Sequence, residues 1–161
     1  MRRRLPSSHA ATASRVRPGA YYHLVTRGVN GRTIFLDDDD RRRFLTLLSL
    51  AARRSAWNVH AWCSMSNHYH LLIEATTGEV SAALRLLNGR YAQFFNDRHD
   101  RRGHLWRDCF RVTRVESDDH LERALLYVVE NPLRARLVSR IDDWRWCGFA
   151  APTGSVVGSA L

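Results

Sequence analysis

Two β-type segments separated by only two residues are the feature that most constrains the fold. Trp57–Met65 and His68–Glu74 are rich in aromatic and aliphatic residues. Such a pair with a two-residue connection predicts a β-hairpin, and therefore an antiparallel sheet. Side chains two apart on a strand share one face, so His68 and His70 should stand together while Tyr69 points to the other face.

The other periodic segments predict an α+β protein. Their order along the chain is a strand at Tyr21–Thr26, a helix at Asp37–Arg54, the hairpin, a helix at Ser81–Asn96, a strand at Leu105–Val115, and a helix from Ser117 that ends at Pro132. Proline at a helix end fits because it lacks the N–H that a further turn needs. This order is the ferredoxin-like β-α-β-β-α-β plan of four antiparallel strands under two helices, with an added C-terminal helix.

The chain of 161 residues is long enough for one domain with a real core. We expect a basic flexible arm over residues 1–19, a folded domain over 20–149, and a loose tail over 150–161. The formal net charge is +9, and all 25 basic residues are arginines. This charge favours an anionic partner, with nucleic acid first, although a merely soluble basic surface is the alternative.

The sequence also bears on the compartment. Cys63, Cys109 and Cys147 are widely spaced and form no Cys-x-x-Cys motif, which indicates reduced thiols in a reducing compartment. No apolar run approaches the ~20 residues that cross a bilayer, and no apolar segment follows the N-terminal arginines as in a secretory signal. We therefore expect a cytoplasmic protein without a membrane partner.

Four polar residues suggest a chemistry when they are taken together. Tyr127 and Asn131 lie four residues apart in the last predicted helix, so they share a face. Two imidazoles and one amide oxygen, from His68, His70 and Asn131, could hold a divalent cation with open positions for substrate. A phenol beside such a cation could attack phosphorus, provided that a positive field or a base activates it.

Other interpretations of these residues are open. The run Asp37–Asp40 resembles a metal cluster, but acidic residues at a helix N-terminus explain it better. A zinc site could use His60, Cys63, His68 and His70, although the first two have opposite parity on a strand and no standard spacing is present. A non-catalytic ferredoxin-like protein that binds single-stranded nucleic acid would explain the charge and the aromatic residues, but would not need Tyr127 with Asn131.

The runs NHYHLLIE, GHLWRDCFRVTRVES and LLYVVENPLRARLV resemble the single-tyrosine HUH transposases, and among them the REP-associated tyrosine transposases. The resemblance extends from about Gly19 to Phe149. It implies that His68 and His70 bind the metal and that Asn131 is its third ligand. It also implies that Tyr127 is the nucleophile that becomes linked to DNA as a 5′-phosphotyrosine.

The same resemblance implies a Mg²⁺ or Mn²⁺ cofactor and a single-stranded or hairpin DNA substrate at palindromic repeats. It leaves open a homodimer, and it suggests a bacterial protein associated with the nucleoid. Arg27, Gly28 and Asn30 match the family's segment near its guide bases. The residues themselves add further expected DNA contacts, in the same turn and on the basic fourth strand: Arg32, Arg107, Arg111 and Arg114.

Overall fold

The computed structural model describes residues 17–76, 78–107 and 110–149. Most of the predicted arm (residues 1–16) and the predicted tail therefore lie outside the described residues. The strands are β1 (Ala20–Arg27), β2 (Trp57–Ser64), β3 (His68–Ala75), β4 (Arg111–Arg114) and β5 (Cys147–Phe149). The helices are α1 (Asp38–Arg54), α2 (Val80–Arg98) and α3 (Asp118–Arg134), with 3₁₀ turns η1 (Val29–Gly31) and η2 (Ile141–Asp143).

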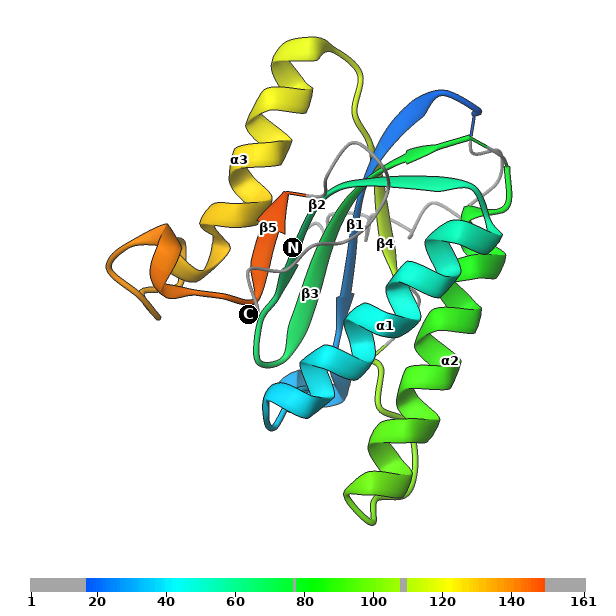
Figure 1. Ribbon diagram of the computed structural model, residues 1–161, viewed down its shortest axis with the longest axis vertical. Helices are drawn as coiled ribbons and strands as arrows, with labels where there is room; N and C mark the ends of the chain where they lie inside the picture. Colours follow the sequence, from blue (N-terminus) through cyan, green and yellow to red (C-terminus); the bar gives the residue numbers. More distant parts are fainter. Residues whose placement is uncertain (1–16, 77, 108–109, 150–161) are drawn as a thin grey trace, which may run out of the picture.

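The strands form one antiparallel sheet in the order β4-β1-β3-β2-β5. Helices α1 and α2 cover one face of this sheet, and α3 lies against the other (Figure 1). The predicted ferredoxin-like fold is confirmed. The fifth strand was not predicted, because three residues are too short to show a period; pairing with β2 makes them a strand. β4 is shorter than the predicted strand, because only Arg111–Arg114 of that segment form a continuous ladder with β1.

The larger core cluster lies between the sheet and α1 and α2. Tyr69 and Tyr91 are fully buried there. The hydroxyl of Tyr69 accepts a hydrogen bond from Thr26 (2.9 Å) and donates one to Asn88 (2.8 Å), and that of Tyr91 donates to the carbonyl of Ile34 (2.6 Å). Burial raises the pKa of both phenols. These two tyrosines therefore serve the core.

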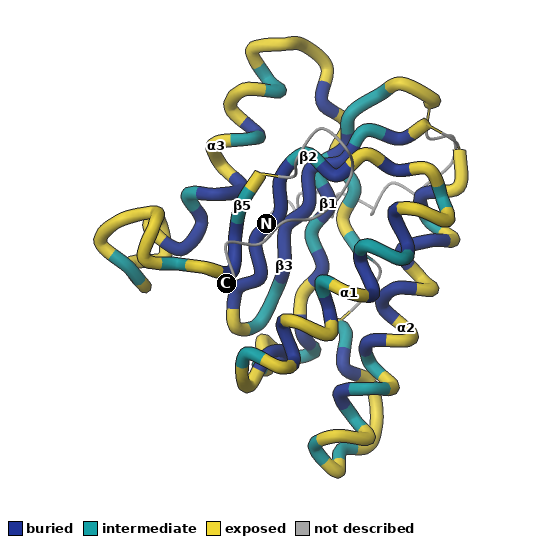
Figure 2. The backbone as a smooth tube through the Cα atoms, in the orientation of Figure 1, coloured by how far each residue is buried: buried dark blue, intermediate teal, exposed yellow. Residues whose placement is uncertain are grey.

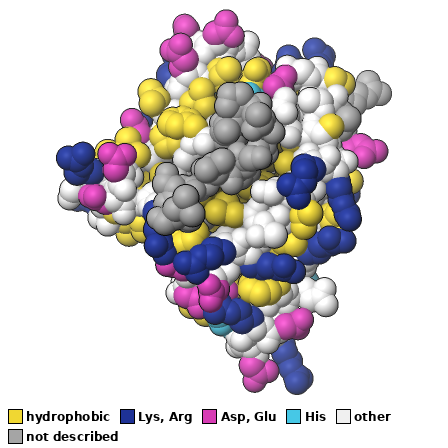
Figure 3. All heavy atoms as spheres, viewed as in Figure 1, with side chains coloured by type: hydrophobic (Ala, Val, Ile, Leu, Met, Phe, Trp, Pro, Cys, Tyr) yellow, Lys and Arg dark blue, Asp and Glu magenta, His cyan; other side chains and the backbone are white. Residues whose placement is uncertain are grey.

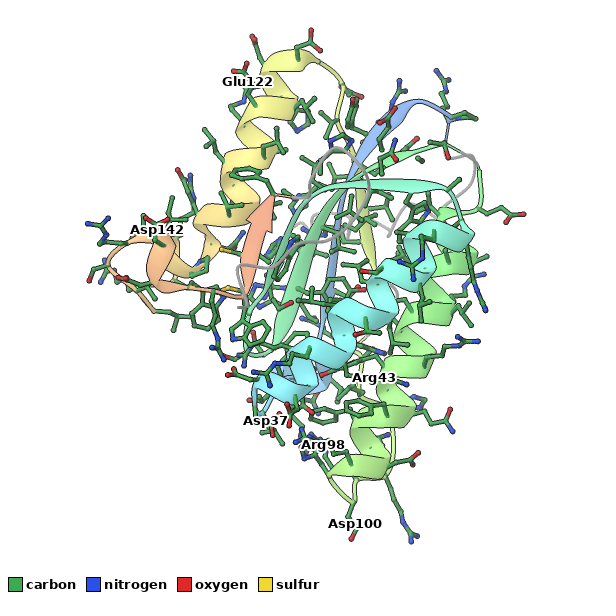
Figure 4. All side chains as sticks on the ribbon, in the orientation of Figure 1. Asp37, Arg43, Arg98, Asp100, Glu122 and Asp142 are labelled. Carbon is green, nitrogen blue, oxygen red and sulfur yellow. The ribbon has the colours of Figure 1, made fainter. Side chains whose placement is uncertain are left out.

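The run of acidic residues begins α1 and ties it to α2. The side chain of Asp37 accepts a hydrogen bond from the backbone N–H of Asp40 (3.0 Å) and caps the helix. Asp40 is buried, and its carboxylate contacts Arg98 (2.6 Å) and His99 (2.9 Å) at the end of α2. Asp37 and Arg98 lie side by side at the lower end of the two helices in Figure 4, and their contact lowers the pKa of Asp37 to about 2. Helix capping and ion pairing thus explain this run.

The two sides of the sheet differ in exposure. β3 is buried along most of its length, whereas α3 leaves much of its outer surface exposed (Figure 2). Arginines also lie over α1 and α2, on the side away from α3 (Figure 3). Net charge alone therefore does not locate a DNA-binding face. Among the described residues, none of the helices is both long and apolar enough to cross a membrane.

Candidate active site

His68 and His70 stand together at the start of β3, on the face that α3 covers. Their ring centroids are 5.0 Å apart, and the rings are nearly perpendicular. His70 is only 2% exposed, while His68 is half-buried. The register places His68 opposite Arg27 and His70 opposite Val25 of β1. The strand period thus brings the two imidazoles together, as predicted from their spacing.

Asn67 orients the first of these rings. Nδ1 of His68 lies 2.7 Å from Oδ1 of Asn67. Because an amide oxygen only accepts, His68 must donate through Nδ1, and its Nε2 keeps the lone pair. The amide nitrogen of Asn67 donates to the carbonyl of Gly31 (3.2 Å), so the same side chain also holds the η1 turn against the histidine pair.

His23 on β1, which the sequence analysis missed, orients the second ring. Its Nε2 lies 2.9 Å from Nδ1 of His70, and the two rings stack almost in parallel with centroids 5.2 Å apart. Nε2 of His70 is buried and has no hydrogen-bond partner among the described residues. His23 sits at an alternate position of the first predicted strand. The alternation of side chains could therefore have assigned His23 to one face of the strand. The sequence could not show that β1 pairs with β3 and so brings His23 beside His70.

All three histidines are held neutral at neutral pH. Burial lowers the pKa of His70 to about 2, with the neighbouring His23, His68 and Arg27 adding to the effect. Burial likewise lowers the pKa of His68 and of His23 to about 4 each, helped by Arg27 and His120 respectively. Neutral imidazole is the form that binds metals. A buried Nε2 without a partner, next to a second Nε2 with a free lone pair, therefore fits a divalent cation.

Tyr127 reaches this site from α3. Its ring meets those of His70 and His23 edge to face, with centroids 5.8 and 5.7 Å apart, and the side chain remains 41% exposed. The guanidinium carbon of Arg134 lies 5.4 Å from the centroid of the Tyr127 ring. Arg134 is held there by Glu130, whose carboxylate accepts from its Nη2 (2.8 Å) and Nε (3.2 Å).

The phenol opens into a cleft of about 470 Å³. Two arginines, Arg123 and Arg134, are among the residues that line it. The others are His23, His120, Ala124, Leu126, Tyr127 and Glu130. A partly exposed phenol in a cleft with two arginines suits a nucleophile that must meet an anionic phosphate.

Asn131 lies one turn beyond Tyr127 and is 8% exposed. Its amide nitrogen donates to the carbonyl of Tyr127 (2.7 Å), so Oδ1 is the atom that remains for a cation. In the described part of the chain, no hydrogen bond joins Asn131 to either histidine. The predicted helix end at Pro132 was wrong, because α3 continues to Arg134. The carbonyl of Val128, which Pro132 leaves without its usual donor, has the amide of Asn131 at 3.4 Å.

Most of the predicted DNA contacts gather beside His68. Arg27 is exposed and pairs with His68 in the strand register, and its carbonyl accepts from the N–H of Arg107 (2.9 Å). Asn30 and Arg32 are also exposed, in and just after η1, and Asn30 has a positive φ of 52°. The turn thus presents several side chains to solvent next to the histidine pair.

Gly28 differs from these residues because it is buried and its N–H donates to the carbonyl of Asn67 (2.8 Å). A Cβ at this position would lie 2.2 Å from the carbonyl oxygen of Arg32 and 2.8 Å from Cγ2 of Ile34. The close packing of the turn therefore requires glycine there.

The two arginines of β4 lie on opposite faces of the sheet. Arg111 is opposite Val25, which pairs on its other side with His70, so Arg111 shares the face of the histidines. Arg114 is opposite Tyr22, a residue of the larger core cluster, and belongs to the other face by register. The register therefore places Arg111 on the face of the histidines and Arg114 on the opposite face, both on the edge strand.

The zinc site considered from the sequence does not form among the described residues. No group of three or more His, Cys, Asp or Glu side chains within residues 17–76, 78–107 and 110–149 could hold a metal ion. His60 contacts Glu74 at 3.3 Å and the ring of Tyr21, away from the histidine pair. Cys63 is a buried free thiol on β2, and the strand register places it opposite the free thiol of Cys147 on β5.

Comparisons with known proteins agree with this fold. The structure is similar to "Structure of the REP associates tyrosine transposase bound to a REP hairpin", with a TM-score of 0.66, 16% sequence identity, and coverage of 83% of this chain and 81% of that one. It is also similar to a putative transposase from Deinococcus radiodurans R1, with a TM-score of 0.51, 21% identity, and coverage of 73% and 95%.

A third similar structure has another activity: the tRNA(His) guanylyltransferase of Saccharomyces cerevisiae, with a TM-score of 0.53, 9% identity, and coverage of 76% and 62%. Fold likeness alone therefore does not decide the function. No curated protein matches the chain in sequence. Residues 17–131, however, match the family described as "Transposase IS200 like". The chain thus belongs to the family of IS200-like transposases, proteins that process DNA.

Proposed function

We propose that this protein is a metal-dependent endonuclease and strand transferase that cleaves single-stranded or hairpin DNA through a 5′-phosphotyrosine intermediate, with Tyr127 as the nucleophile. The observation that carries the proposal is the contact of the Tyr127 ring with the ring of His70. In this contact an exposed phenol from α3 meets a neutral imidazole of the histidine pair on β3.

In the proposed reaction, Oη of Tyr127 attacks the scissile phosphorus and forms a P–O bond. The bond between phosphorus and the 3′ oxygen of the preceding nucleotide breaks. The phenol loses its proton and the leaving 3′ oxygen gains one, so the products are a 5′-phosphotyrosine and a free 3′-hydroxyl. Attack by a 3′-hydroxyl on the phosphotyrosine reverses these steps and rejoins DNA, which is strand transfer.

The residues that would hold the cation are His68 and His70 through Nε2 and Asn131 through Oδ1. A bound Mg²⁺ or Mn²⁺ would polarise the scissile phosphate and neutralise part of its charge. Arg134 supports the phenol, because its guanidinium group lies near the ring and attracts the phosphate to it.

For the substrate, we propose the backbone and bases of single-stranded or hairpin DNA at palindromic repeats. Exposed arginines lie at the end of β1, just after η1 and on β4. A similarly folded structure is of a REP-associated tyrosine transposase bound to a REP hairpin, which supports a hairpin substrate. The expected contacts remain Arg27, Gly28, Asn30, Arg32, Arg107, Arg111 and Arg114, with Gly28 acting through the shape of the turn.

We further propose that the arm over residues 1–19 adds phosphate contacts and that the protein acts on the bacterial nucleoid in the cytoplasm. Phosphate contacts make affinity fall with salt, so binding to a hairpin oligonucleotide should weaken steeply as ionic strength rises. Equal affinity for plain duplex and for single-stranded DNA in a competition at fixed salt would contradict the proposed substrate.

The decisive test is the covalent adduct. Incubation with hairpin oligonucleotides and Mg²⁺ should give a protein–DNA species that survives denaturation and maps to Tyr127. The Tyr127→Phe variant removes only the hydroxyl group, so it should bind the oligonucleotide normally and form no adduct. Tyr21→Phe is the matched control, because Tyr21 is a half-buried tyrosine on the same sheet face and contacts His60 instead.

Two results would overturn the proposal. One is an undiminished adduct in the Tyr127→Phe variant. The other is binding without any adduct for every oligonucleotide and metal tried, which would favour the non-catalytic nucleic-acid-binding protein instead.

A further inference from the structure

His23 contacts both parts of the proposed active site. Its imidazole is hydrogen-bonded to Nδ1 of His70 (2.9 Å) and stacks on that ring at an interplanar angle of 16°. Its ring also meets the Tyr127 ring edge to face.

We propose that His23 is a positioning residue that accepts a hydrogen bond from Nδ1–H of His70, so that Nε2 of His70 keeps its lone pair for the divalent cation. The inference rests on the metal-dependent function proposed above. It adds a residue that neither binds the metal nor attacks DNA.

The direction of this hydrogen bond follows from burial. A neutral imidazole carries one N–H. If His23 donated to His70, the proton of His70 would sit on Nε2, which is buried and has no acceptor among the described residues. Leaving a buried donor without a partner costs about 1–3 kcal/mol. In the opposite direction Nε2 carries a lone pair, which a cation can satisfy, and the ligand is oriented through its other nitrogen.

The backbone holds His23 rigidly in this place. His23 lies in the middle of β1, which pairs with β3 on one side and β4 on the other. The neighbours Tyr22 and Leu24 are buried on the opposite face of the sheet, so the strand cannot rotate without exposing them. Because its ring touches Tyr127 as well, His23 also limits where the phenol can lie.

The chemical identity of this partner has a consequence for the metal. Metal-ligating histidines usually donate to a carboxylate, a backbone carbonyl or water. Here the partner of His70 is an imidazole, and the partner of His68 is the amide of Asn67. The proposed ligands and their hydrogen-bond partners thus carry no negative charge. The full charge of the cation would therefore act on the phosphate of the substrate.

The experiment compares His23→Leu, which removes the acceptor, with His23→Gln, whose Oε1 can still accept. Mn²⁺ affinity of the DNA-free protein, measured by electron paramagnetic resonance, should fall about 10- to 100-fold in His23→Leu. Most of that loss should be recovered in His23→Gln. His60→Leu is the matched control, because His60 also contacts a tyrosine ring on this sheet face but bonds to Glu74, and its Mn²⁺ affinity should equal that of the wild type.

A second measurement needs neither metal nor DNA. Long-range ¹H–¹⁵N spectra of the metal-free wild-type protein should show His70 protonated on Nδ1. A proton on Nε2, or an unchanged Mn²⁺ affinity in His23→Leu with a native circular dichroism spectrum, would overturn the inference and leave the proposed function standing. If His70→Ala instead binds Mn²⁺ as tightly as the wild type, the proposed metal site is wrong, and the proposed function is overturned with it.

Discussion

The ring of Tyr127 lies 5.8 Å from the ring of His70 in the same chain, edge to face at 80°. Helix α3 packs on the sheet of its own chain through Ala124, Val128 and Val129, which belong to the second core cluster together with residues of β2 and β3. The proposed nucleophile and one of the proposed metal ligands, His70, therefore meet within one chain.

This arrangement predicts action in cis. His70→Ala and Tyr127→Phe should each be inactive, and an equimolar mixture of the two should also form no adduct. The reason is that each subunit supplies both parts of its own site. The measurement is adduct formation after mixing and prolonged incubation at high concentration. Recovery of a sizeable fraction of wild-type activity in the mixture would show that α3 works on a partner subunit.

Replacing Arg134 by Gln should slow adduct formation by about 10- to 1,000-fold, because the phosphate loses a cationic donor beside the phenol. Hairpin affinity should change far less. Arg134→Lys should recover part of the rate, since it keeps the charge. Arg140→Gln is the control, because Arg140 is 75% exposed outside the cleft. Equal rates for Arg134→Gln and Arg140→Gln would exclude this role.

Two glycine substitutions, one beside the η1 turn and one in α2, should have opposite effects on stability. Gly28→Ala should lower the free energy of unfolding by at least about 1–3 kcal/mol, because the new Cβ meets the carbonyl of Arg32 at 2.2 Å. It should also weaken Mn²⁺ binding, because the N–H of Gly28 is hydrogen-bonded to the carbonyl of Asn67, and the side chain of Asn67 orients His68. Gly89→Ala in α2 meets nothing within 4 Å and should stabilise the protein by about 0.5–1 kcal/mol. Denaturant unfolding that ranks the two variants in the opposite order would contradict this prediction.

Without metal, the protein should lose stability as the pH falls from about 6.5 to about 4. In the folded state the pKa of His23 and of His68 is about 4 and that of His70 about 2, against 6.5 for the unfolded chain. The unfolded state therefore binds more protons in this window, and the loss should be on the order of a few kcal/mol. The carboxylate of Asp37, with its pKa of about 2, stays ionised throughout.

The corresponding measurement is urea unfolding in a chelating buffer at pH 7.5 and pH 4.5. The variant His70→Asn removes one of the three histidines, so the difference between the two pH values should be smaller than in the wild type. The same unfolding free energy at both pH values would show that these histidines are not kept neutral by the fold.

Local patterns in the sequence were enough to predict much of this protein. The alternation at His68 and His70 predicted a shared face because a strand has a period of two. The spacing of Tyr127 and Asn131 placed them on one side of a helix for the same kind of reason. The order of strand and helix periods predicted the ferredoxin-like core. Asp37 and its acidic neighbours were correctly interpreted as a helix start.

Other features were decided only by the tertiary structure. His23 joins the site because β1 pairs with β3 in one particular register, and a period of two does not specify which residues of two strands meet. β5 exists only because Cys147–Phe149 pairs with β2. Arg111 and Arg114 are three residues apart, so they lie on opposite faces of a strand, but only the pairing with β1 decides which of them shares the face of the histidines. The approach of the Tyr127 ring to the rings of His70 and His23 depends on how α3 packs over the sheet, because long-range packing, unlike local periodicity, is set by all the contacting surfaces at once.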